Sequence, residues 1–79
     1  MSPEMKDISL LAPMPGVIVS VKVAVGDTVK QDDVILEYEA MKMKNVLLAP
    51  EDCTVKQLNV TAGQNVKKRD VLVILTVKE

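Results

Sequence analysis

The residues that could do chemistry in this 79-residue chain lie near its middle, in the stretch Glu39-Ala40-Met41-Lys42-Met43. Lys42 stands between two flexible, apolar methionines, in a chain that is otherwise typical of β-strands. The simplest interpretation is an ordinary solvated lysine. A sharper hypothesis is that Lys42 is presented to another protein. A free lysine is mostly protonated and a poor nucleophile at neutral pH, so chemistry at its amine requires an enzyme.

The composition argues against catalysis by the chain itself. Histidine is absent and Cys53 is the only cysteine, which excludes Ser-His-Asp triads, Cys-His pairs and zinc sites. Asp27, Asp32 and Asp33 lack the spacing of an EF-hand loop and are interpreted as turn residues. We therefore expect no catalytic residues and no metal ligands.

Charge and hydropathy also narrow the classes of partner. The chain has 10 basic and 11 acidic residues, and its most basic run, residues 67–69, has no aromatic neighbours on which bases could stack. We expect no binding to nucleic acid. No apolar run approaches the ~20 residues of a membrane span, and no signal peptide is recognisable, so no membrane insertion is expected. A single cysteine allows no internal disulfide, and a cytoplasmic location is expected.

The aliphatic composition predicts an all-β domain. Valine is abundant, aromatic residues make up 1% of the chain, and glycine and proline are sparse but well spaced. The length fits one domain. Residues 1–7 are polar and lack a pattern, so we expect a flexible N-terminal segment followed by a domain over residues 8–79.

The chain contains an internal repeat with an offset of 37 positions. Ala12-Pro13 falls on Ala49-Pro50, Gly26 falls on Gly63, and the apolar positions between and beyond them also match. Each glycine follows a predicted strand, where it would supply a positive φ for a tight turn. The repeated region spans residues 12–73, so Lys42 lies at the join of the two halves.

The two halves predict a similar series of strands. The expected strands are Ile8–Leu11, Val17–Val23, Val34–Ala40, Met43–Leu48, Thr54–Val60 and Val71–Val77, with short extended pieces near Thr28–Lys30 and Asn65–Lys67. Each half would expose one apolar face. We expect the halves to pack face to face as a small sandwich or flattened barrel.

The repeat also resolves the register of the first long strand. Residues 17–25 carry valine at every odd position, but comparison with the second half predicts that Ile18, Val21 and Val23 face the core. The change of phase between them indicates a β-bulge. Val17 and Val19 are then expected to be partly exposed.

If the strands over residues 34–40 and 43–48 are antiparallel neighbours, Met41-Lys42 forms the tip of a two-residue hairpin. Such turns prefer Asn-Gly because they require positive φ. A Met-Lys pair there would be strained by ~1–3 kcal/mol. Strain at an exposed lysine is a local conflict of the kind that occurs at functional sites.

The motif in this setting resembles the biotinyl attachment domain, or biotin carboxyl carrier domain, of biotin-dependent carboxylases and decarboxylases. The resemblance covers roughly Leu11 to Val77 and includes Ala12-Pro13-Met14-Pro15-Gly16, Gly26-Asp27-Thr28-Val29 and Ala49-Pro50. It implies a barrel-sandwich hybrid: a flattened β-barrel of two four-stranded antiparallel sheets with pseudo-two-fold symmetry. The acceptor lysine of this family sits on a protruding hairpin, and the chain ends meet at the opposite side.

The resemblance also implies roles for the motif. Lys42 would carry covalent biotin, while Glu39, Ala40, Met41 and Met43 would be read by a biotin protein ligase. The domain would then be a non-catalytic carrier. It would shuttle carboxyl groups as carboxybiotin between biotin carboxylase and a carboxyltransferase or decarboxylase partner.

Four positions depart from the family's pattern. Cys53 mirrors Gly16, and Asp32 and Arg69 stand where the family often has glycine. Lys44 lies two residues beyond Lys42, on the same side of the strand but away from the tip.

Two alternative functions remain open. One is a lipoyl carrier domain, although lipoyl domains typically have Asp-Lys-Ala around the acceptor lysine. The other is a structural β-domain that is never modified.

Overall fold

The computed structural model describes residues 5–78, and within this range all regular structure is β-strand. The strands are β1 (Met5–Leu11), β2 (Gly16–Val21), β3 (Thr28–Val29), β4 (Val34–Ala40), β5 (Met43–Leu48), β6 (Cys53–Leu58), β7 (Asn65–Val66) and β8 (Val71–Lys78). No helix in this part of the chain is long and apolar enough to cross a bilayer. The all-β prediction is confirmed.

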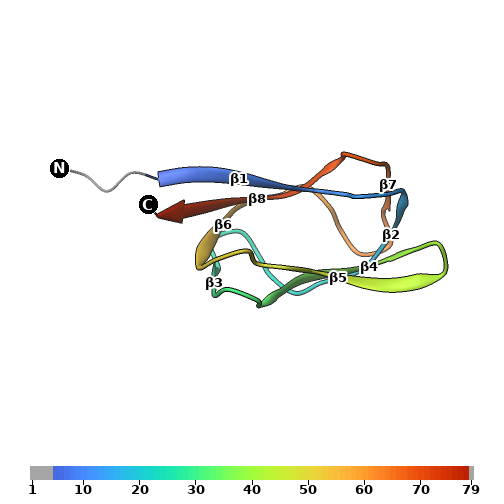
Figure 1. Cartoon of the computed structure of the whole chain (residues 1–79), viewed down its shortest axis with the longest axis horizontal. Coiled ribbons are helices and arrows are strands. Elements are labelled where there is room, and N and C mark those ends of the chain that lie inside the picture. Colours follow the sequence, from blue (N-terminus) through green and yellow to red (C-terminus); the bar gives the residue numbers. More distant parts are fainter. Residues whose placement is uncertain (1–4, 79) are drawn as a thin grey trace.

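The strands form two four-stranded sheets that face each other (Figure 1). One sheet has the order β1-β8-β6-β3 and is called sheet A here; the other has the order β5-β4-β2-β7 and is called sheet B. All neighbouring strands are antiparallel. This arrangement confirms the expected flattened barrel-sandwich.

The internal repeat is a true structural repeat. Adding 37 to the residue numbers of sheet B's β4 and β2 gives β8 and β6 of sheet A, and the same offset converts β1 and β3 into β5 and β7. Loop hydrogen bonds repeat as well: the Ala12 N–H donates to the Asp70 carbonyl at 2.9 Å, and the Ala49 N–H donates to the Asp33 carbonyl at 2.9 Å. The two sheets are therefore related by a pseudo-two-fold axis.

The expectation that each half forms one face of the sandwich is wrong. In the first half, β2 and β4 lie in sheet B, whereas β1 and β3 lie in sheet A; in the second half, β6 and β8 lie in sheet A, whereas β5 and β7 lie in sheet B. The short strand β3 crosses to pair with β6, and β7 crosses to pair with β2. Each sheet thus takes strands from both halves. Backbone groups on the open side of β2 and β6 need partners, and a crossing strand from the other half supplies them.

The crossings also explain why β2 and β6 are shorter than expected. Both strands end two residues before the predicted boundaries, Val23 and Val60, because the chain there turns toward the opposite sheet. The Gly26 N–H, for example, already donates to the Val55 carbonyl of sheet A at 2.8 Å. Val60 remains buried and Val23 remains packed against the core.

The predicted bulge in β2 is confirmed. The register of β2 with β4 shifts between Ile18 and Ser20, so that the chain changes phase at Val19. Ile18 is fully buried, whereas Val17 and Val19 are each 39% exposed. Val21 is partly buried against the core, as expected. An equivalent shift occurs in β6, at the corresponding place in the repeat.

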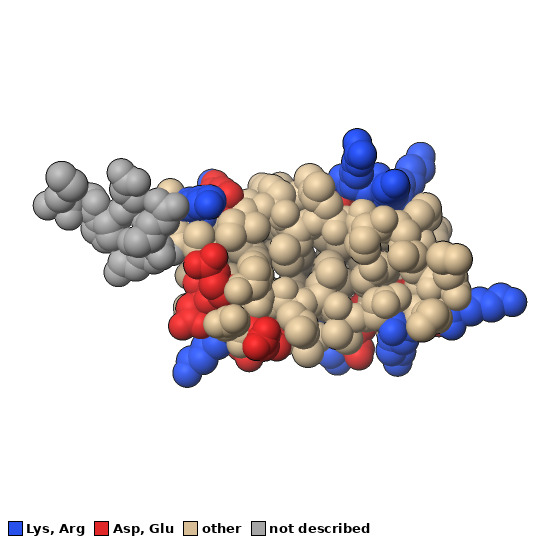
Figure 2. All heavy atoms as spheres, viewed as in Figure 1, with Lys and Arg blue, Asp and Glu red and all other residues tan. Residues whose placement is uncertain are grey.

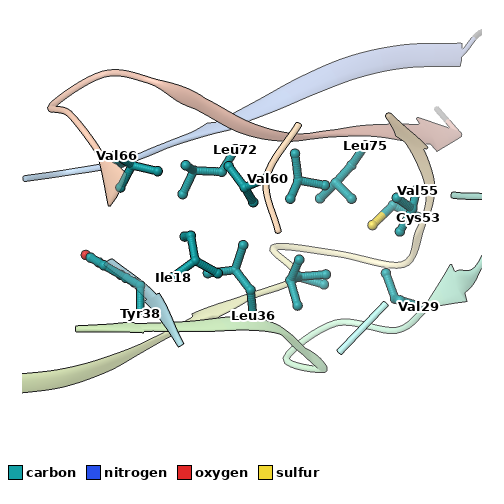
Figure 3. Packing of buried hydrophobic residues seen from close by; sticks show 14 of the residues in the cluster. Ile18, Val29, Leu36, Tyr38, Cys53, Val55, Val60, Val66, Leu72 and Leu75 are labelled. Carbon is teal, nitrogen blue, oxygen red and sulfur yellow. The ribbon is translucent and has the colours of Figure 1, made fainter. Parts of the chain in front are cut away.

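A single aliphatic core fills the space between the sheets (Figure 3). Its fully buried side chains come from both sheets: Ile18, Ile35, Leu36, Val55, Leu72, Val73, Leu75 and Val77. Tyr38 is the one aromatic residue of the chain and is 3% exposed. No polar or charged residue among those described is buried, so burial of apolar area dominates the stabilisation.

The expected flexible N-terminal segment, residues 1–7, is wrong for its last three residues. Met5, Lys6 and Asp7 belong to β1 and pair with residues 76–78 of β8. The Asp7 carboxylate accepts hydrogen bonds from Lys56 Nζ at 2.5 Å and from Thr76 Oγ1 at 3.1 Å. The edge of β8 supplies the backbone hydrogen-bond partners of these three residues. Their polar side chains gave no sign of this pairing in the sequence. Residues 1–4 lie outside the described residues.

The first residue of β1 and the last residue of β8 lie at the end of the molecule opposite the β4–β5 hairpin. Met5 pairs with Lys78 at one end of the molecule, while the β4–β5 connection projects at the other end (Figure 1). This confirms the arrangement that the family resemblance implied. The hairpin is the pseudo-symmetric counterpart of the place where the chain begins and ends.

Candidate functional site

The β4–β5 connection is a two-residue hairpin, as the sequence predicts. Ala40 pairs with Met43, leaving Met41 and Lys42 as the two central residues. Their φ angles are 54° and 64°, and a type I′ turn requires positive φ at both positions. Each residue thus occupies a backbone region that costs ~1–2 kcal/mol for a residue other than glycine. The predicted strain is present in the structure.

The side chains at the tip of this hairpin are exposed to solvent. Met41 is 81% exposed and Met43 is 67% exposed, and Lys42 and Glu39 are also exposed. The methionines therefore do not pack against the barrel. Large, flexible apolar side chains in solvent are available to a docking protein, and methionine adapts its shape to different surfaces.

 Ala40 is the one buried residue of the motif. Its side chain is only 4% exposed. The motif had suggested that a ligase reads this residue, but little of the side chain is open to direct contact. It packs instead at the foot of the hairpin, beside Gly16 of β2. Any contribution of Ala40 to recognition acts through the position of the hairpin.

Gly16 allows β2 and β4 to approach closely just below the motif. A Cβ atom built on Gly16 would lie 2.4 Å from the Glu39 carbonyl oxygen and 3.2 Å from the Ala40 Cβ. Neither backbone nor a buried alanine can move aside easily, so a side chain at this position would displace β4. Sequence analysis recognised Gly16 as part of the family's opening motif but not this contact, which depends on the pairing of strands far apart in the chain.

Tyr38 and Asn45 form the second pair of residues below Ala40 and Met43, after Glu39 and Lys44. Tyr38 is buried under the sheet, and the loss of hydration raises the pKa of its hydroxyl above the ordinary value. The Asn45 side-chain amide donates to the Met43 carbonyl at 3.2 Å. The burial of Tyr38 anchors β4 in the core just below the tip, whereas the Asn45 hydrogen bond is local to β5.

Lys44 is the other lysine near the tip, and it lies within β5. It pairs with Glu39 across the hairpin, and its backbone is part of the regular strand ladder. Lys42, in contrast, lies in the turn itself. The structure thus separates the two lysines by backbone context, as expected from the strand pattern.

The other departures from the family's pattern are accommodated in different ways. Asp32 and Arg69 have φ angles of 72° and 73°, so these two turns do use the left-handed region in which glycine is common. Cys53 does not have a positive φ and is buried; burial raises the pKa of its thiol. Gly26 and Gly63 have φ angles of 94° and 88°, which confirms their predicted role in tight turns.

Charged side chains are unevenly distributed between the two ends of the molecule. Figure 2 shows lysine and arginine side chains gathered over the end with the hairpin and the β7–β8 loop, and acidic side chains gathered toward the end with β3 and β6, where some basic side chains also lie. Residues 67–69 and Lys42 contribute to the basic end, while residues 51–52 and the β3–β4 loop contribute to the acidic end. Composition alone, with a net charge of −1, conceals this polarity.

Comparison with known proteins assigns the chain to a family. The family described as Biotin-requiring enzyme matches residues 8–75, which is most of the chain. The chain belongs to this family.

Proteins with similar sequences include a carrier protein and a decarboxylase subunit. The chain is 44% identical over 64 residues to the biotin carboxyl carrier protein of Streptococcus mutans, covering 81% of this chain and 49% of that protein. It is 47% identical over 64 residues to the methylmalonyl-CoA decarboxylase subunit gamma of Veillonella parvula, covering 81% of this chain and 50% of that subunit.

The fold is also similar to part of a much larger carboxylase. A single-chain, multi-domain long-chain acyl-CoA carboxylase contains a region that matches with a TM-score of 0.82 and 33% sequence identity. The match covers 89% of this chain and 7% of the carboxylase. The chain spans half or less of the length of each of these three proteins.

Proposed function

We propose that the chain is a biotinyl carrier domain in which Lys42 is the site of covalent biotin attachment. The observation that carries this proposal is the position of Lys42: an exposed lysine in a strained two-residue turn, at the end of the molecule opposite the chain ends, in a chain of the biotin-requiring enzyme family. The relatives named above, a biotin carboxyl carrier protein and a decarboxylase subunit, support the same assignment.

The chemistry of Lys42 fits biotin attachment. Its amine extends from a turn that is not part of the strand ladder, so acylation disturbs no backbone hydrogen bond of the barrel. A biotin protein ligase would supply an activated biotinyl group, biotinyl-adenylate. The neutral Nζ of Lys42 would form a C–N bond to the acyl carbon of the adenylate while the acyl C–O bond to the AMP phosphate breaks. AMP leaves, the proton released from Nζ passes to solvent, and a neutral amide remains. Glu39, Met41 and Met43 are exposed around this amine and are the residues that we assign to ligase recognition.

The geometry of the hairpin supports a carrier role. Biotin held on Lys42 would supply a ureido nitrogen able to carry a carboxyl group, and the exposed tip would present it to a biotin carboxylase, which uses bicarbonate and ATP, and to a carboxyltransferase or decarboxylase. The barrel keeps the hairpin tip projecting into solvent. Tethering through Lys42 would raise the local concentration of biotin at each partner's active site to about the millimolar range. Catalysis resides in the partners, and we propose no catalytic residue in this chain.

Intact mass and streptavidin binding after co-expression with a biotin ligase test the attachment site. We expect the wild-type chain to gain one biotinyl group, Lys42→Arg to gain none, and Lys44→Arg, the matched control, to be modified like the wild type. Labelling that persists in Lys42→Arg and disappears in Lys44→Arg would contradict the site. A lipoyl group in place of biotin, or no modification of the wild type, would contradict the proposed function.

A further inference from the structure

Because the chain repeats, each loop can be compared with the equivalent loop in the other half. The loops that follow β3 and β7 have the same backbone: the Asp32 N–H donates to the Ala49 carbonyl at 2.8 Å, and the Arg69 N–H donates to the Ala12 carbonyl at 2.8 Å. Both residues have the same left-handed conformation. A side chain that differs between the two loops is therefore not required by the fold.

The two loops differ in charge. Residues 30–33 read Lys-Gln-Asp-Asp, with one net negative charge, whereas residues 67–70 read Lys-Lys-Arg-Asp, with two net positive charges. The aspartate that both loops share has a structural role, because Asp33 accepts from the Lys30 N–H at 3.0 Å and Asp70 accepts from the Lys67 N–H at 2.8 Å. The substitutions that set the charge are Lys68 for Gln31 and Arg69 for Asp32.

The segments that lie beside the two loops also differ in charge: the one beside the first loop is acidic and the one beside the second is not. Glu51-Asp52 lies beside the first loop, where Asp52 Oδ1 accepts from the Gln31 N–H at 2.9 Å. The equivalent segment beside the second loop is Met14-Pro15, which carries no acidic group. Met14 packs partly against the core and Pro15 is exposed. The second loop thus has an apolar neighbour where the first has two carboxylates.

This apolar and basic surface lies at the same end as Lys42. In sheet B, Gly16 pairs with Val66 and Val17 pairs with both Glu39 and Asn65. The chain therefore leaves β7 at Lys67 on the side toward which the hairpin projects (Figure 1). Residues 67–69 are exposed, and among the described residues no carboxylate lies within 4.0 Å of their charged groups.

We infer that Met14, Pro15 and residues 67–69, named the basic shoulder here, form a docking surface for an acidic patch on the partner protein that receives the group carried on Lys42. The inference rests on the proposed function. An apolar centre with a basic rim fits a protein surface of opposite charge, because complementary charges accelerate encounter and fix orientation. Since the charges are exposed, their contribution is sensitive to salt.

The test gives the second loop the charges of the first without changing its backbone. Lys68→Gln with Arg69→Asp copies the first loop onto the second. Lys30→Glu with Gln31→Glu changes the net charge by the same amount at the opposite end of the molecule and is the matched control. The biotinylated proteins serve as substrates for a biotin carboxylase subunit and for the carboxyl-transfer or decarboxylase subunit, both purified from the organism that encodes the chain. The measured quantities are KM for the carrier and kcat.

We expect the shoulder variant to raise KM about 10-fold at low salt with the carboxyl-transfer or decarboxylase subunit, with kcat unchanged and with a difference that disappears by about 0.5 M NaCl. The control variant should keep the wild-type KM. Equal KM values for both variants with that subunit, a KM effect confined to the biotin carboxylase, or an effect that salt does not change, would overturn the inference while leaving the proposed function intact.

Two further outcomes count against the inference. Concentration-dependent self-association of the wild type in sedimentation, absent from the shoulder variant, would assign the basic shoulder to the acidic end of a second copy. A wild-type chain that is not biotinylated, or that neither subunit uses, would overturn the proposed function and the inference together.

Discussion

The Glu39 carbonyl oxygen lies so close to Gly16 that a methyl group added to Gly16 would come within 2.4 Å of it. Gly16 has no positive φ, so it is this approach of two backbones, and not the turn conformation, that requires glycine. The contact connects the family's opening motif with the first residue of the lysine motif. It fixes how β4 enters the hairpin.

Replacing Gly16 with alanine should therefore destabilise the fold and disturb the tip. We expect Gly16→Ala to lower the free energy of unfolding by about 2–3 kcal/mol, because backbone must shift to make room, and to slow biotinylation. Denaturant unfolding and the rate of modification measure the two effects. Cys53→Ala places the same residue at the pseudo-symmetric position, which already holds a side chain, and should cost about 1 kcal/mol or less. Equal losses in the two variants would contradict this account.

The hairpin tip should gain stability when its strain is removed. Met41→Asn with Lys42→Gly introduces the pair that two-residue hairpins prefer, and we expect the free energy of unfolding to rise by about 1–2 kcal/mol while modification is lost. Met41→Asn alone should give about half of this gain and keep Lys42. Lys42→Arg is the control, which loses modification without gaining stability. A destabilised double variant would show that the methionine and lysine are not strained.

Arg69 occupies a left-handed conformation without a glycine. Arg69→Gly should raise the free energy of unfolding by about 0.5–1 kcal/mol, since relief of ~1–2 kcal/mol of strain exceeds the entropic cost of glycine. Asp32→Gly should give a smaller gain, because aspartate tolerates this region better than arginine. Thermal and denaturant unfolding of the three proteins measure the difference. A loss of stability in Arg69→Gly would mean that its side chain has packing interactions that outweigh the strain.

Glu37 should make the stability of sheet B depend on pH. The Ser20 hydroxyl donates to Glu37 Oε1 at 2.7 Å, and the Lys22 ammonium lies 3.8 Å from the same oxygen. The hydrogen bond, followed by the Lys22 charge, lowers the pKa of Glu37 from its ordinary value of 4.5. A lowered pKa in the folded state adds stability above pH 4.5, and that stability is lost as the pH falls through the folded value.

Glu37→Gln should accordingly be less stable than the wild type at pH 7, with a difference that shrinks as the pH falls below 4.5. Denaturant unfolding at a series of pH values measures the difference. Ser20→Ala removes the main stabilising partner and should weaken the pH dependence in the same direction. A stability difference that is constant from neutral to acidic pH would show that the carboxylate acts by packing alone.

Much of the fold was predictable from the sequence because the repeat compares each position with a second example. The repeat located the bulge at Val19, the turn glycines Gly26 and Gly63, and the place of Lys42 at the join. Local patterns were sufficient for these features, since they depend on residues close together in the chain. Where the prediction was wrong, at Met5–Asp7 and in the assignment of halves to faces, the missing partner was a distant strand.

The sequence by itself determined the strands, their two-fold repetition and the two-residue turn that carries Lys42, because alternation of apolar residues and the offset of 37 positions are properties of the chain. Only the tertiary structure decided that β3 and β7 exchange sheets, that Ala40 is buried against Gly16, and that residues 67–69 lie at the same end as Lys42. These relationships arise from hydrogen bonds and close packing between segments distant in sequence, and no local pattern records them.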